Sequence, residues 1–294
     1  MNLFDDLPES VCRRNVPLAP LTWFHLGGPA EYLISPQSES QLAAVIRRCR
    51  DSGTPVRLLG LGANIIVPDE GVTGVVIRLD AGEFVDTRVE GSRVFAGGGV
   101  DMTKLIRKTV RLGLAGLENL AGIPGTVGGG IAMNCGGRYG EIGAVVQRVR
   151  VAGPDGKLYD RDHDDLEFGY RHCSLGADCV TSAVFELHEV DPADLELRFR
   201  EIWMYKQNTQ PPLGAQSVGC IFRNPNGRSA GEIIDRAGLK GMRLGSAYVS
   251  DRHANFVLAD PGGRASDVIN LIRLVGQRVE DQCGIRLEPE VKIW

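Results

Sequence analysis

The stretch Gly122–Glu141, GIPGTVGGGIAMNCGGRYGE, is the most informative segment of this 294-residue chain. Eight of its twenty residues are glycine, whereas 38 glycines in 294 residues would give about three. Its charged residues are Arg138 and Glu141, and Ile, Val, Met and Pro lie among the glycines, unlike the Ser-rich composition of a flexible linker. Bare backbone lets a large ligand lie against main-chain N–H groups. We therefore predict a buried, ordered loop that contacts a ligand.

Length and composition limit the possible classes of protein. A chain of this length has room for two or three domains, and 43% hydrophobic and 24% charged residues are typical of a globular protein. The net charge of -4 gives no reason to expect nucleic acid as a partner. No apolar run reaches the length of a membrane span, and the acidic start MNLFDDLPES differs from a signal peptide.

The cysteines indicate the compartment. Their number is odd and no CxxC occurs, so we expect neither a disulfide framework nor a metal site, and we predict a reducing cytoplasm. The seven are Cys12, Cys49, Cys135, Cys173, Cys179, Cys220 and Cys283.

Hydrophobic periodicity and capping residues predict the order of helices and strands. Residues 1–20 read as an irregular lead-in. Ser38 and Gln41 form a capping box for the first helix, and Gly53 ends it. Helices are expected at Ser38–Asp51, Asp101–Leu112, Pro192–Lys206, Ser229–Ala237 and Ser266–Cys283. Strands are expected at Val56–Gly62, Val75–Leu79, Arg93–Ala96, Val145–Ala152, Leu158–Tyr159, Val180–His188 and Asn255–Ala259, with an edge strand in the last ten residues.

This order is a mixed α+β pattern and lacks the regular alternation of a dinucleotide-binding sheet. Pro211-Pro212 marks a domain boundary after the helix Pro192–Lys206.

Two further glycine clusters have alternative interpretations. The first, Leu58–Val67, has the sequence LLGLGANIIV and reads as a buried strand followed by a turn. The turn either points backbone amides at a phosphate or is a tight turn with no ligand. It lacks the third glycine of a Rossmann fingerprint and the Lys of a P-loop. Gly97–Gly99 before the next helix reads better as a strand-to-helix corner than as a phosphate loop.

The remaining candidates carry ionisable groups. Arg171 within FGYRHC can hold a carboxylate with two hydrogen bonds, although an isolated arginine is more often a structural or surface residue. His172 likewise reads as a surface or core-edge residue rather than a catalyst. Cys220 lies in GCIFRNP, which is either a buried strand or a binding loop. Glu288 and Glu290 are either solvated charges near the end of the chain or, because Pro289 between them restricts the backbone, one of them is aimed inward.

Together, in this order and spacing, the motifs resemble the UDP-N-acetylenolpyruvoylglucosamine reductase (MurB) family of peptidoglycan synthesis. The resemblance runs from about Leu21 to the C-terminus. Its motifs are TWFHLGGPA, LGLGANIIV, GLENLAGIPGTVGG, MNCGGRYGE, FGYRHC, QPPLGAQSVGCIFRNP, AGEIIDRAGLKG and LEPEV. The spacing from Arg171 to Gln210 is similar to the shorter form of the family.

The resemblance implies an α+β fold with a two-lobed FAD-binding domain of the vanillyl-alcohol-oxidase type and a smaller α+β substrate-binding domain. The implied divisions are residues 1–80, joined by the C-terminal strand 286–294, for the first flavin lobe, 81–198 for the second, and 199–285 for the substrate domain. The implied FAD contacts are Gly60, Leu61, Gly62, Ala63, Asn64, Ile65, Gly122, Ile123, Pro124, Gly125, Thr126, Gly128, Gly129, Ala132, Asn134 and Gly136.

The implied reaction reduces the enolpyruvyl group of UDP-GlcNAc-enolpyruvate to give UDP-N-acetylmuramate, with NADPH as the hydride donor and FAD as the carrier. Arg171 and Glu290 stabilise the enolate, where charge develops in the reaction. The family's proton donor is usually a serine, and Cys220 stands at the matching position. A thiol, with an ordinary pKa of about 8.5, is a stronger acid than an alcohol, so we expect Cys220 to keep the role.

The implied substrate contacts are Arg171, Lys206, Gln210, Asn224, His253 and Asn255. Two further departures from the family pattern are Ala63, where serine is frequent, and Cys135, where alanine is frequent. Ala63 removes one hydrogen bond to phosphate, and Cys135 reads as a packing residue.

We expect a cytoplasmic, monomeric oxidoreductase and flavoprotein of cell-wall biogenesis, and so of cell shape, the cell cycle and cell division, with no metal. Two alternatives remain: an oxidase on the same flavin fold, and a catalytically silent module that binds flavin or a UDP-sugar. GCIFRNP and LEPEV count against the oxidase. Retention of Arg171, Glu290 and an ionisable residue at 220 counts against the silent module.

Overall fold

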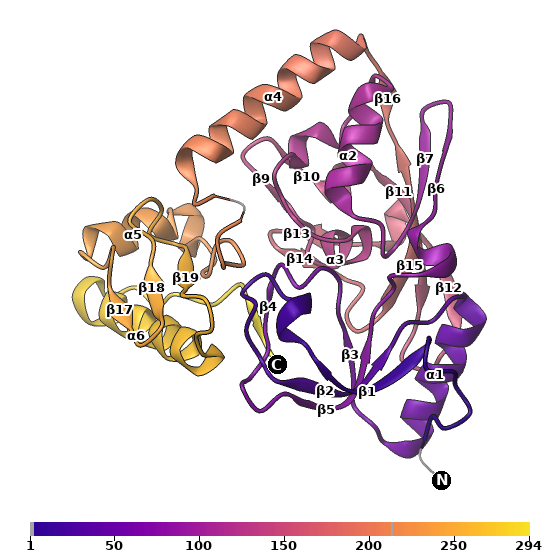
Figure 1. The fold of residues 1–294 in the computed structure, drawn as a ribbon. Helices are drawn as coiled ribbons and strands as arrows, with labels where there is room; N and C mark the ends of the chain where they lie inside the picture. Colours follow the sequence, from indigo (N-terminus) through magenta and orange to yellow (C-terminus); the bar gives the residue numbers. More distant parts are fainter. Residues whose placement is uncertain (1–2, 213) are drawn as a thin grey trace. The chain divides into compact units, whose positions relative to one another are not determined.

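The computed structural model describes residues 3–212 and 214–294. Met1 and Asn2 of the predicted lead-in, and Leu213 of the predicted QPPLGAQSVGCIFRNP motif, lie outside the described residues. The chain forms two compact units (Figure 1). The first unit comprises the residues up to Arg14, Tyr32–Leu61 and Thr73–Tyr205. The second comprises Asn15–Glu31, Gly62–Val72 and the described part of Lys206–Trp294.

The N-terminal part of the chain forms a four-stranded sheet in the order β1-β2-β5-β3. The residues of β1, β2 and β5 are divided between the two units. The β3–β5 pair of this sheet is parallel. The helix α1 supplies Leu42, Val45, Ile46 and Cys49 to the core beside it, which also contains Ile34, Val75 and Ile77. The elements are β1 (Cys12–Pro17), β2 (Pro29–Ile34), α1 (Glu39–Ser52), β3 (Val56–Leu58) and β5 (Val72–Ile77).

The ends of α1 follow the predicted capping with one difference. The Ser38 hydroxyl accepts from the Gln41 N–H at 3.3 Å, and Gly53 adopts a φ of 67° at the C-cap. The side chain of Gln41 accepts from the N–H of Gln37 at 2.7 Å rather than from Ser38, so the reciprocal half of the capping box is displaced by one residue.

A five-stranded antiparallel sheet in the order β12-β11-β15-β7-β6 forms the rest of the first unit's framework. Its apolar face packs with α2 and α3 into one core (Figure 1). Asp101 caps α2, as predicted, by accepting from the N–H groups of Thr103 and Lys104. The elements are β6 (Thr87–Glu90), β7 (Arg93–Gly97), α2 (Met102–Arg111), α3 (Val127–Ala132), β11 (Val146–Ala152), β12 (Leu158–Asp162) and β15 (Cys179–Glu186).

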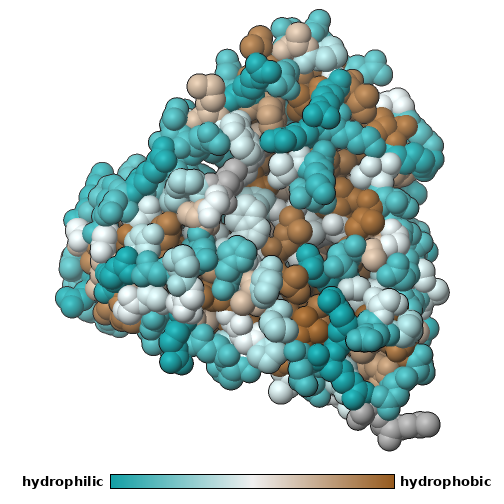
Figure 2. Space-filling model, viewed as in Figure 1, coloured by the Kyte–Doolittle hydropathy of each residue, from teal (hydrophilic) through white to brown (hydrophobic). Residues whose placement is uncertain are grey.

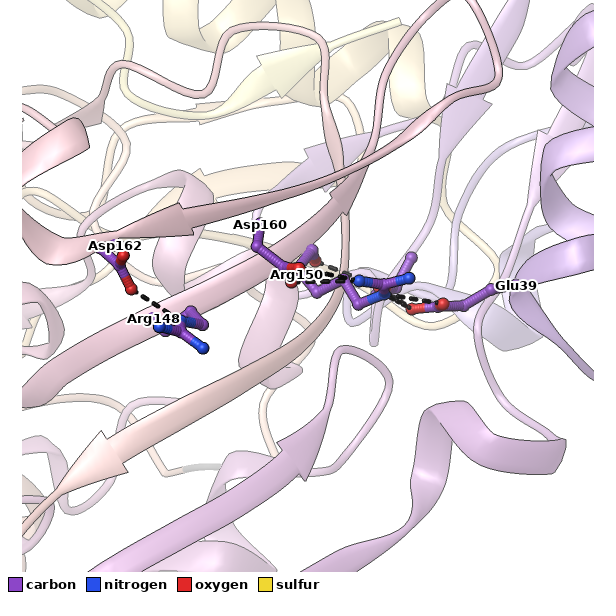
Figure 3. Close-up of polar contacts among 6 residues, drawn as sticks. Glu39, Arg148, Arg150, Asp160 and Asp162 are labelled. Carbon is purple, nitrogen blue, oxygen red and sulfur yellow. Dashed lines mark hydrogen bonds and ion pairs between the residues drawn. The ribbon is translucent and has the colours of Figure 1, made fainter.

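Ion pairs tie α1 to this sheet (Figure 3). Arg150 on β11 lies between Glu39, at 2.9 Å, and Asp160 of β12, at 3.0 Å. The buried Thr181 hydroxyl donates to the same Glu39 carboxylate at 2.7 Å. A separate pair, Arg148 and Asp162, lies on the exposed face. Glu39 thus links the first turn of α1 to two strands.

Short strands and one long helix complete the first unit. The strands are β8 (Leu114–Ala115), β9 (Gly136–Gly137), β10 (Gly140–Glu141), β13 (Phe168–Gly169), β14 (His172–Cys173) and β16 (His188–Glu189). They form the pairs β9–β10, β13–β14 and β8–β16. The helix α4 (Pro192–Thr209) starts in this unit and extends into the second, with the side chain of Arg198 paired to the buried Glu118 at 3.4 Å.

The second unit has its own core of buried side chains on α5, α6 and a three-stranded sheet in the order β17-β18-β19. The apolar face of α6 is formed by Val268, Leu271, Ile272, Val275 and Val279, at helical spacing. Strand β20 pairs in parallel with β4. The elements are β4 (Ile65–Ile66), α5 (Ala230–Arg236), β17 (Arg243–Leu244), β18 (Ala247–Val249), β19 (Val257–Ala259), α6 (Ala265–Cys283) and β20 (Lys292–Ile293).

The predicted α+β class is confirmed, and three local expectations are wrong. Residues 12–17 form β1 within the supposed irregular lead-in. The strand predicted at Val56–Gly62 is three residues long, and Val56 and Leu58 are 38% and 39% exposed, because this short piece pairs with β5 alone at the edge of its sheet. The glycine segment contains the short helix α3, because Thr126 caps it, and is therefore not a continuous loop.

Among the described residues, no helix is both long and apolar enough to cross a membrane. Hydrophilic side chains predominate on the face shown in Figure 2, with hydrophobic ones interspersed.

Candidate functional site

The glycine segment is held in place by backbone pairing to the corner that precedes α2. The Val127 N–H donates to the Val100 carbonyl at 2.9 Å, and the Gly128 N–H donates to the Gly98 carbonyl at 2.8 Å. A Cβ at Gly128 would lie 3.1 Å from that carbonyl oxygen, so a side chain there would push the two segments apart by a few tenths of an ångström. Gly97–Gly99 is the predicted strand-to-helix corner, since it joins β7 to α2.

The first predicted phosphate loop meets the glycine segment inside the first unit. A Cβ at Gly60 would lie 2.7 Å from the Oγ1 of Thr126, so the backbone at 60 packs directly against that side chain. Within residues 3–212 and 214–294, the N–H groups of Gly60, Leu61, Gly125 and Thr126 take no part in the backbone hydrogen bonds found. Gly125 has a φ of 147° and open space where a Cβ would be.

These features fit an anionic ligand such as a pyrophosphate. Backbone donors on two adjoining turns form the kind of concavity in which N–H groups bind phosphate. The same segment can also lie against a flat ring. Gly125 has no side chain, and the space where its Cβ would be is open. The residues present therefore fit the phosphate and ring system of FAD.

Arg171 occupies a two-residue turn in the first unit. Gly169 pairs with His172 in the β13–β14 hairpin, which leaves Tyr170 and Arg171 at its tip. Arg171 has a φ of 54°, a left-handed conformation uncommon for a residue with a long side chain. Its Nη1 donates to the Gly136 carbonyl at 2.8 Å, and its guanidinium lies 5.4 Å from the Tyr170 ring centroid. The predicted arginine thus contacts the predicted glycine segment, whereas His172 is exposed.

Asn134 is fully buried in the glycine segment. Its Nδ2 donates to the Gly169 carbonyl at 3.0 Å, and its Oδ1 accepts from the Gly143 N–H at 3.0 Å. The side chain, expected at the cofactor, is thus bonded to protein backbone. The partners Gly169 and Gly143 gave no signal in the sequence because they contribute only backbone atoms.

In the second unit, Cys220 and Glu290 lie on segments that run side by side. The Glu290 N–H donates to the Ile221 carbonyl at 2.7 Å, and Phe222 forms a bridge with Pro289. Cys220 itself bridges Phe256 and is half-buried. Pro289 therefore lies within a paired segment of the second unit.

Asn64 fixes the C-terminal segment from the other side. Its carbonyl accepts from the Lys292 N–H at 3.1 Å, and its Nδ2 donates to the Glu290 carbonyl at 3.5 Å. The turn Gly62–Asn64 also approaches the start of the unit, because a Cβ at Gly62 would lie 2.4 Å from the Leu21 carbonyl oxygen. The second half of the predicted phosphate loop is thus part of the framework around Glu290.

Asn255 supports the segment that carries Cys220. Its Oδ1 accepts from the Phe222 N–H at 2.9 Å, its Nδ2 donates to the Phe222 carbonyl at 2.8 Å, and the residue is 3% exposed. The expected substrate contact is therefore not supported by its side chain, which is bonded to backbone on both atoms.

The other predicted substrate residues are spread over the second unit. His253 accepts from the Asn255 N–H through Nδ1, which makes Nε2 the protonated nitrogen of the neutral ring. Burial lowers the pKa of His253, so the neutral form is favoured. Asn224 accepts from the Ala230 N–H at 2.9 Å. Lys206 and Gln210 lie at the end of α4, joined by a backbone bond of 2.9 Å.

None of the seven cysteines, all of which lie within the described residues, forms a disulfide. Burial raises the pKa of Cys49 to about 11 and that of Cys179 to about 12, so these two thiols are unreactive at neutral pH. Cys135 is buried against Met102, as expected for a packing residue. In the described part of the chain, no group of three or more His, Cys, Asp or Glu side chains is arranged to hold a metal ion.

Two family models match the chain. Residues 30–161 match an FAD-binding domain, and residues 210–294 match the UDP-N-acetylenolpyruvoylglucosamine reductase C-terminal domain. The enzyme UDP-N-acetylenolpyruvoylglucosamine reductase 2 of Symbiobacterium thermophilum is 41% identical over 96% of this chain and 92% of its own length. The reductase of Heliobacterium modesticaldum is 40% identical over 94% of this chain and 88% of its own. The chain belongs to the UDP-N-acetylenolpyruvoylglucosamine reductase family.

The fold agrees with this membership. The crystal structure of the MurB reductase from Thermus caldophilus superposes with a TM-score of 0.84 at 37% identity, covering 95% of this chain and 97% of that one. A glucose dehydrogenase variant of Phl p 4 superposes with a TM-score of 0.52 at 15% identity, and shows a shared fold only. The resemblance drawn from the motifs, the predicted fold class and the FAD-dependent oxidoreductase class are confirmed.

Proposed function

We propose that this protein reduces the enolpyruvyl group of UDP-GlcNAc-enolpyruvate to UDP-N-acetylmuramate, with NADPH as the source of the hydride. Membership of the reductase family over nearly the whole chain supports this reaction. The substrate is a vinyl ether conjugated to a carboxylate. It therefore needs a hydride at one carbon, a proton at the next, and a cation where negative charge collects.

The cofactor site is proposed for the residues that carry the open backbone donors. Gly60, Leu61, Gly125 and Thr126 would bind the pyrophosphate of FAD, and the rest of the turns 60–65 and 122–136, apart from Asn134, would line it. Bound FAD supplies the hydride that reaches the terminal methylene carbon. We assign Asn134 a positioning role because its amide is bonded to backbone.

Arg171 and Glu290 are proposed to stabilise the enolate. A guanidinium binds a carboxylate through two parallel N–H donors, and its attraction grows as charge builds up in the transition state. Its bond to Gly136 fixes the direction from which Arg171 approaches. Glu290, held at its backbone by Ile221 and Asn64, would bridge to the same group or donate a proton to it.

Cys220 is proposed to deliver the proton to the carbon beside the carboxylate. The pairing of its segment with the Glu290 segment supports this role, because both ionisable groups come from one hydrogen-bonded part of the second unit. This pairing is the observation that carries the proposed mechanism. Asn255, which bonds both backbone groups of Phe222, would hold the thiol in register.

The nucleotide part of the substrate is assigned to Lys206, Gln210, Asn224 and His253. Lys206 offers a cation for a diphosphate, and His253 offers the Nε2–H of a neutral ring. We further propose that the protein is a cytoplasmic monomer. The three-part division at residues 80, 198 and 285 remains a proposal alongside the two compact units.

The proposal is tested with purified holoprotein under anaerobic conditions. NADPH should bleach the flavin absorbance, and UDP-GlcNAc-enolpyruvate should restore it with formation of UDP-N-acetylmuramate. NADH and UDP-GlcNAc, which lacks the enolpyruvyl group, are the matched controls. Bleaching with no reoxidation by the enolpyruvyl substrate would contradict the proposed reaction while leaving flavin binding intact.

A further inference from the structure

Two hydrogen bonds link the Arg171 turn and the glycine segment reciprocally within the first unit. The side chain of Asn134 donates to the backbone of Gly169, which lies two residues before Arg171, at 3.0 Å. The side chain of Arg171 donates to the backbone of Gly136, which lies two residues after Asn134, at 2.8 Å. Each segment thus contributes one side-chain donor and one backbone acceptor.

The backbone at both side chains is in an uncommon conformation. Asn134 has a φ of 40° and Arg171 a φ of 54°. Asparagine tolerates this left-handed region, whereas arginine is strained in it, so the surrounding contacts must hold the Arg171 turn in place. Relaxation of this turn would move the guanidinium away from Gly136.

Both polar atoms of the Asn134 amide are hydrogen-bonded within the first unit. The residue is 0% exposed, and its Oδ1 is held by the Gly143 N–H at 3.0 Å. A Cβ at Gly143 would lie 2.6 Å from the Phe168 ring and 2.9 Å from that Oδ1, so the amide is packed tightly from behind. With Oδ1 fixed in this way, Nδ2 is directed at Gly169.

We propose that Asn134 is a positioning residue for the reductase reaction, which acts by holding the Arg171 turn so that the guanidinium meets the substrate carboxylate. The inference rests on the proposed role of Arg171. Substitution of Asn134 should therefore slow the reoxidation of reduced flavin by UDP-GlcNAc-enolpyruvate and leave its reduction by NADPH unchanged. A displacement of about 1 Å at a reacting group lowers a rate by about 100-fold, so we expect a loss of about 10- to 100-fold.

Two variants remove the Nδ2 donor in different ways. Asn134→Gly keeps the left-handed backbone and deletes the amide. Asn134→Asp keeps the size and the acceptor for Gly143 but places a carboxylate against the Gly169 carbonyl. Asn15→Gly is the matched control, because Asn15 also has a positive φ, of 50°, but is exposed and lies outside this cluster. Flavin content and melting temperature are recorded for each protein.

The decisive measurement compares Asn134→Gly with and without Arg171→Ala in anaerobic stopped-flow reoxidation. If Asn134 acts through Arg171, Asn134→Gly slows the wild type but changes the Arg171→Ala protein by less than about twofold. An equal loss in both backgrounds would overturn the inference, since a general structural defect is additive. No loss in Asn134→Gly or Asn134→Asp, with Arg171→Ala slow, would overturn it too. Normal reoxidation by Arg171→Ala would instead refute the proposed function of Arg171.

Discussion

The backbone N–H of Glu290 donates to the carbonyl oxygen of Ile221 at 2.7 Å. Ile221 follows Cys220, so this bond brings the last segment of the chain alongside the segment that carries the proposed proton donor. Cys220 and Glu290 are separated by 70 positions in the sequence, yet they belong to one hydrogen-bonded part of the second unit.

Thiol labelling should separate Cys220 from the structural cysteines. Burial raises the pKa of Cys49 and Cys179 to about 11 and 12, so neither should react with iodoacetamide at pH 7.5, whereas the exposed Cys283 should react. Cys220 is half-buried and should react slowly. We expect UDP-GlcNAc-enolpyruvate to protect Cys220 and not Cys283, as measured by peptide mass spectrometry. Equal labelling of Cys220 with and without substrate would place it away from the substrate.

Gly125→Ala should weaken flavin binding beyond its effect on stability. A Cβ there meets nothing, but a φ of 147° is costly for alanine, by about 1–3 kcal/mol, and relaxation would move the adjacent N–H groups. Loss of one hydrogen bond to a charged group corresponds to roughly 10- to 100-fold in Kd for FAD.

Gly53→Ala is the control for this change, because Gly53 also has a positive φ, of 67°, with open space around it, at the end of α1. It should lower stability without changing the FAD Kd. Equal flavin affinities of the two variants, measured by fluorescence titration of apoprotein, would contradict the assignment of Gly125.

Glu39→Ala should destabilise the first unit by about 1 kcal/mol, because it removes the partner of Arg150 and of the buried Thr181 hydroxyl (Figure 3). Arg148→Ala removes an ion pair in which both side chains are more than half exposed, and should cost less than about 0.5 kcal/mol. Urea unfolding of the two variants compares them. If Arg148→Ala and Glu39→Ala lowered the free energy of unfolding equally, the Glu39 carboxylate would not be what stabilises the packing of α1 on the sheet.

The stability of the second unit should decrease with acid in a manner that depends on Asp69. Burial raises the pKa of this carboxyl, but hydrogen bonds from Ser266, Ala265 and Arg264 outweigh burial and leave the pKa lowered. A lowered folded-state pKa stabilises above the unfolded value of roughly 3.9, and this stabilisation is lost as the pH falls through the folded value.

Asp69→Asn should therefore cost about 1 kcal/mol at pH 7, as expected for a carboxylate that caps the first turn of α6, and less at pH 3. Urea unfolding at the two pH values measures the difference. A difference between wild type and Asp69→Asn that does not change with pH would contradict the account.

The elements that the sequence predicted well are those whose signals are local. Ser38 and Asp101 mark the starts of two helices and Gly53 marks the end of one. These positions could be predicted because capping depends on a few neighbouring residues. The strand predicted at Val56–Gly62 is shorter and more exposed than expected. A run of apolar residues does not distinguish a central strand from an edge strand, because only the pairing of strands decides this.

The site divides in the same way. The motifs implied that Gly60 and Thr126 contact the same cofactor, and in the structure the backbone of Gly60 lies against the Thr126 side chain. They did not predict that Asn134 and Asn255 bond to backbone carbonyls, since an acceptor such as Gly169 has no side chain to identify it. Only the folded chain brings these partners together.

The role of Cys220 is tested most directly by single-turnover reoxidation of the NADPH-reduced enzyme by UDP-GlcNAc-enolpyruvate under anaerobic conditions. General acid catalysis contributes about 10²- to 10⁴-fold, so Cys220→Ala should lose at least about 100-fold in this step and keep its rate of reduction by NADPH. Cys220→Ser, which introduces the hydroxyl typical of the family, should retain most of the rate. Reoxidation of Cys220→Ala at the wild-type rate would contradict the account.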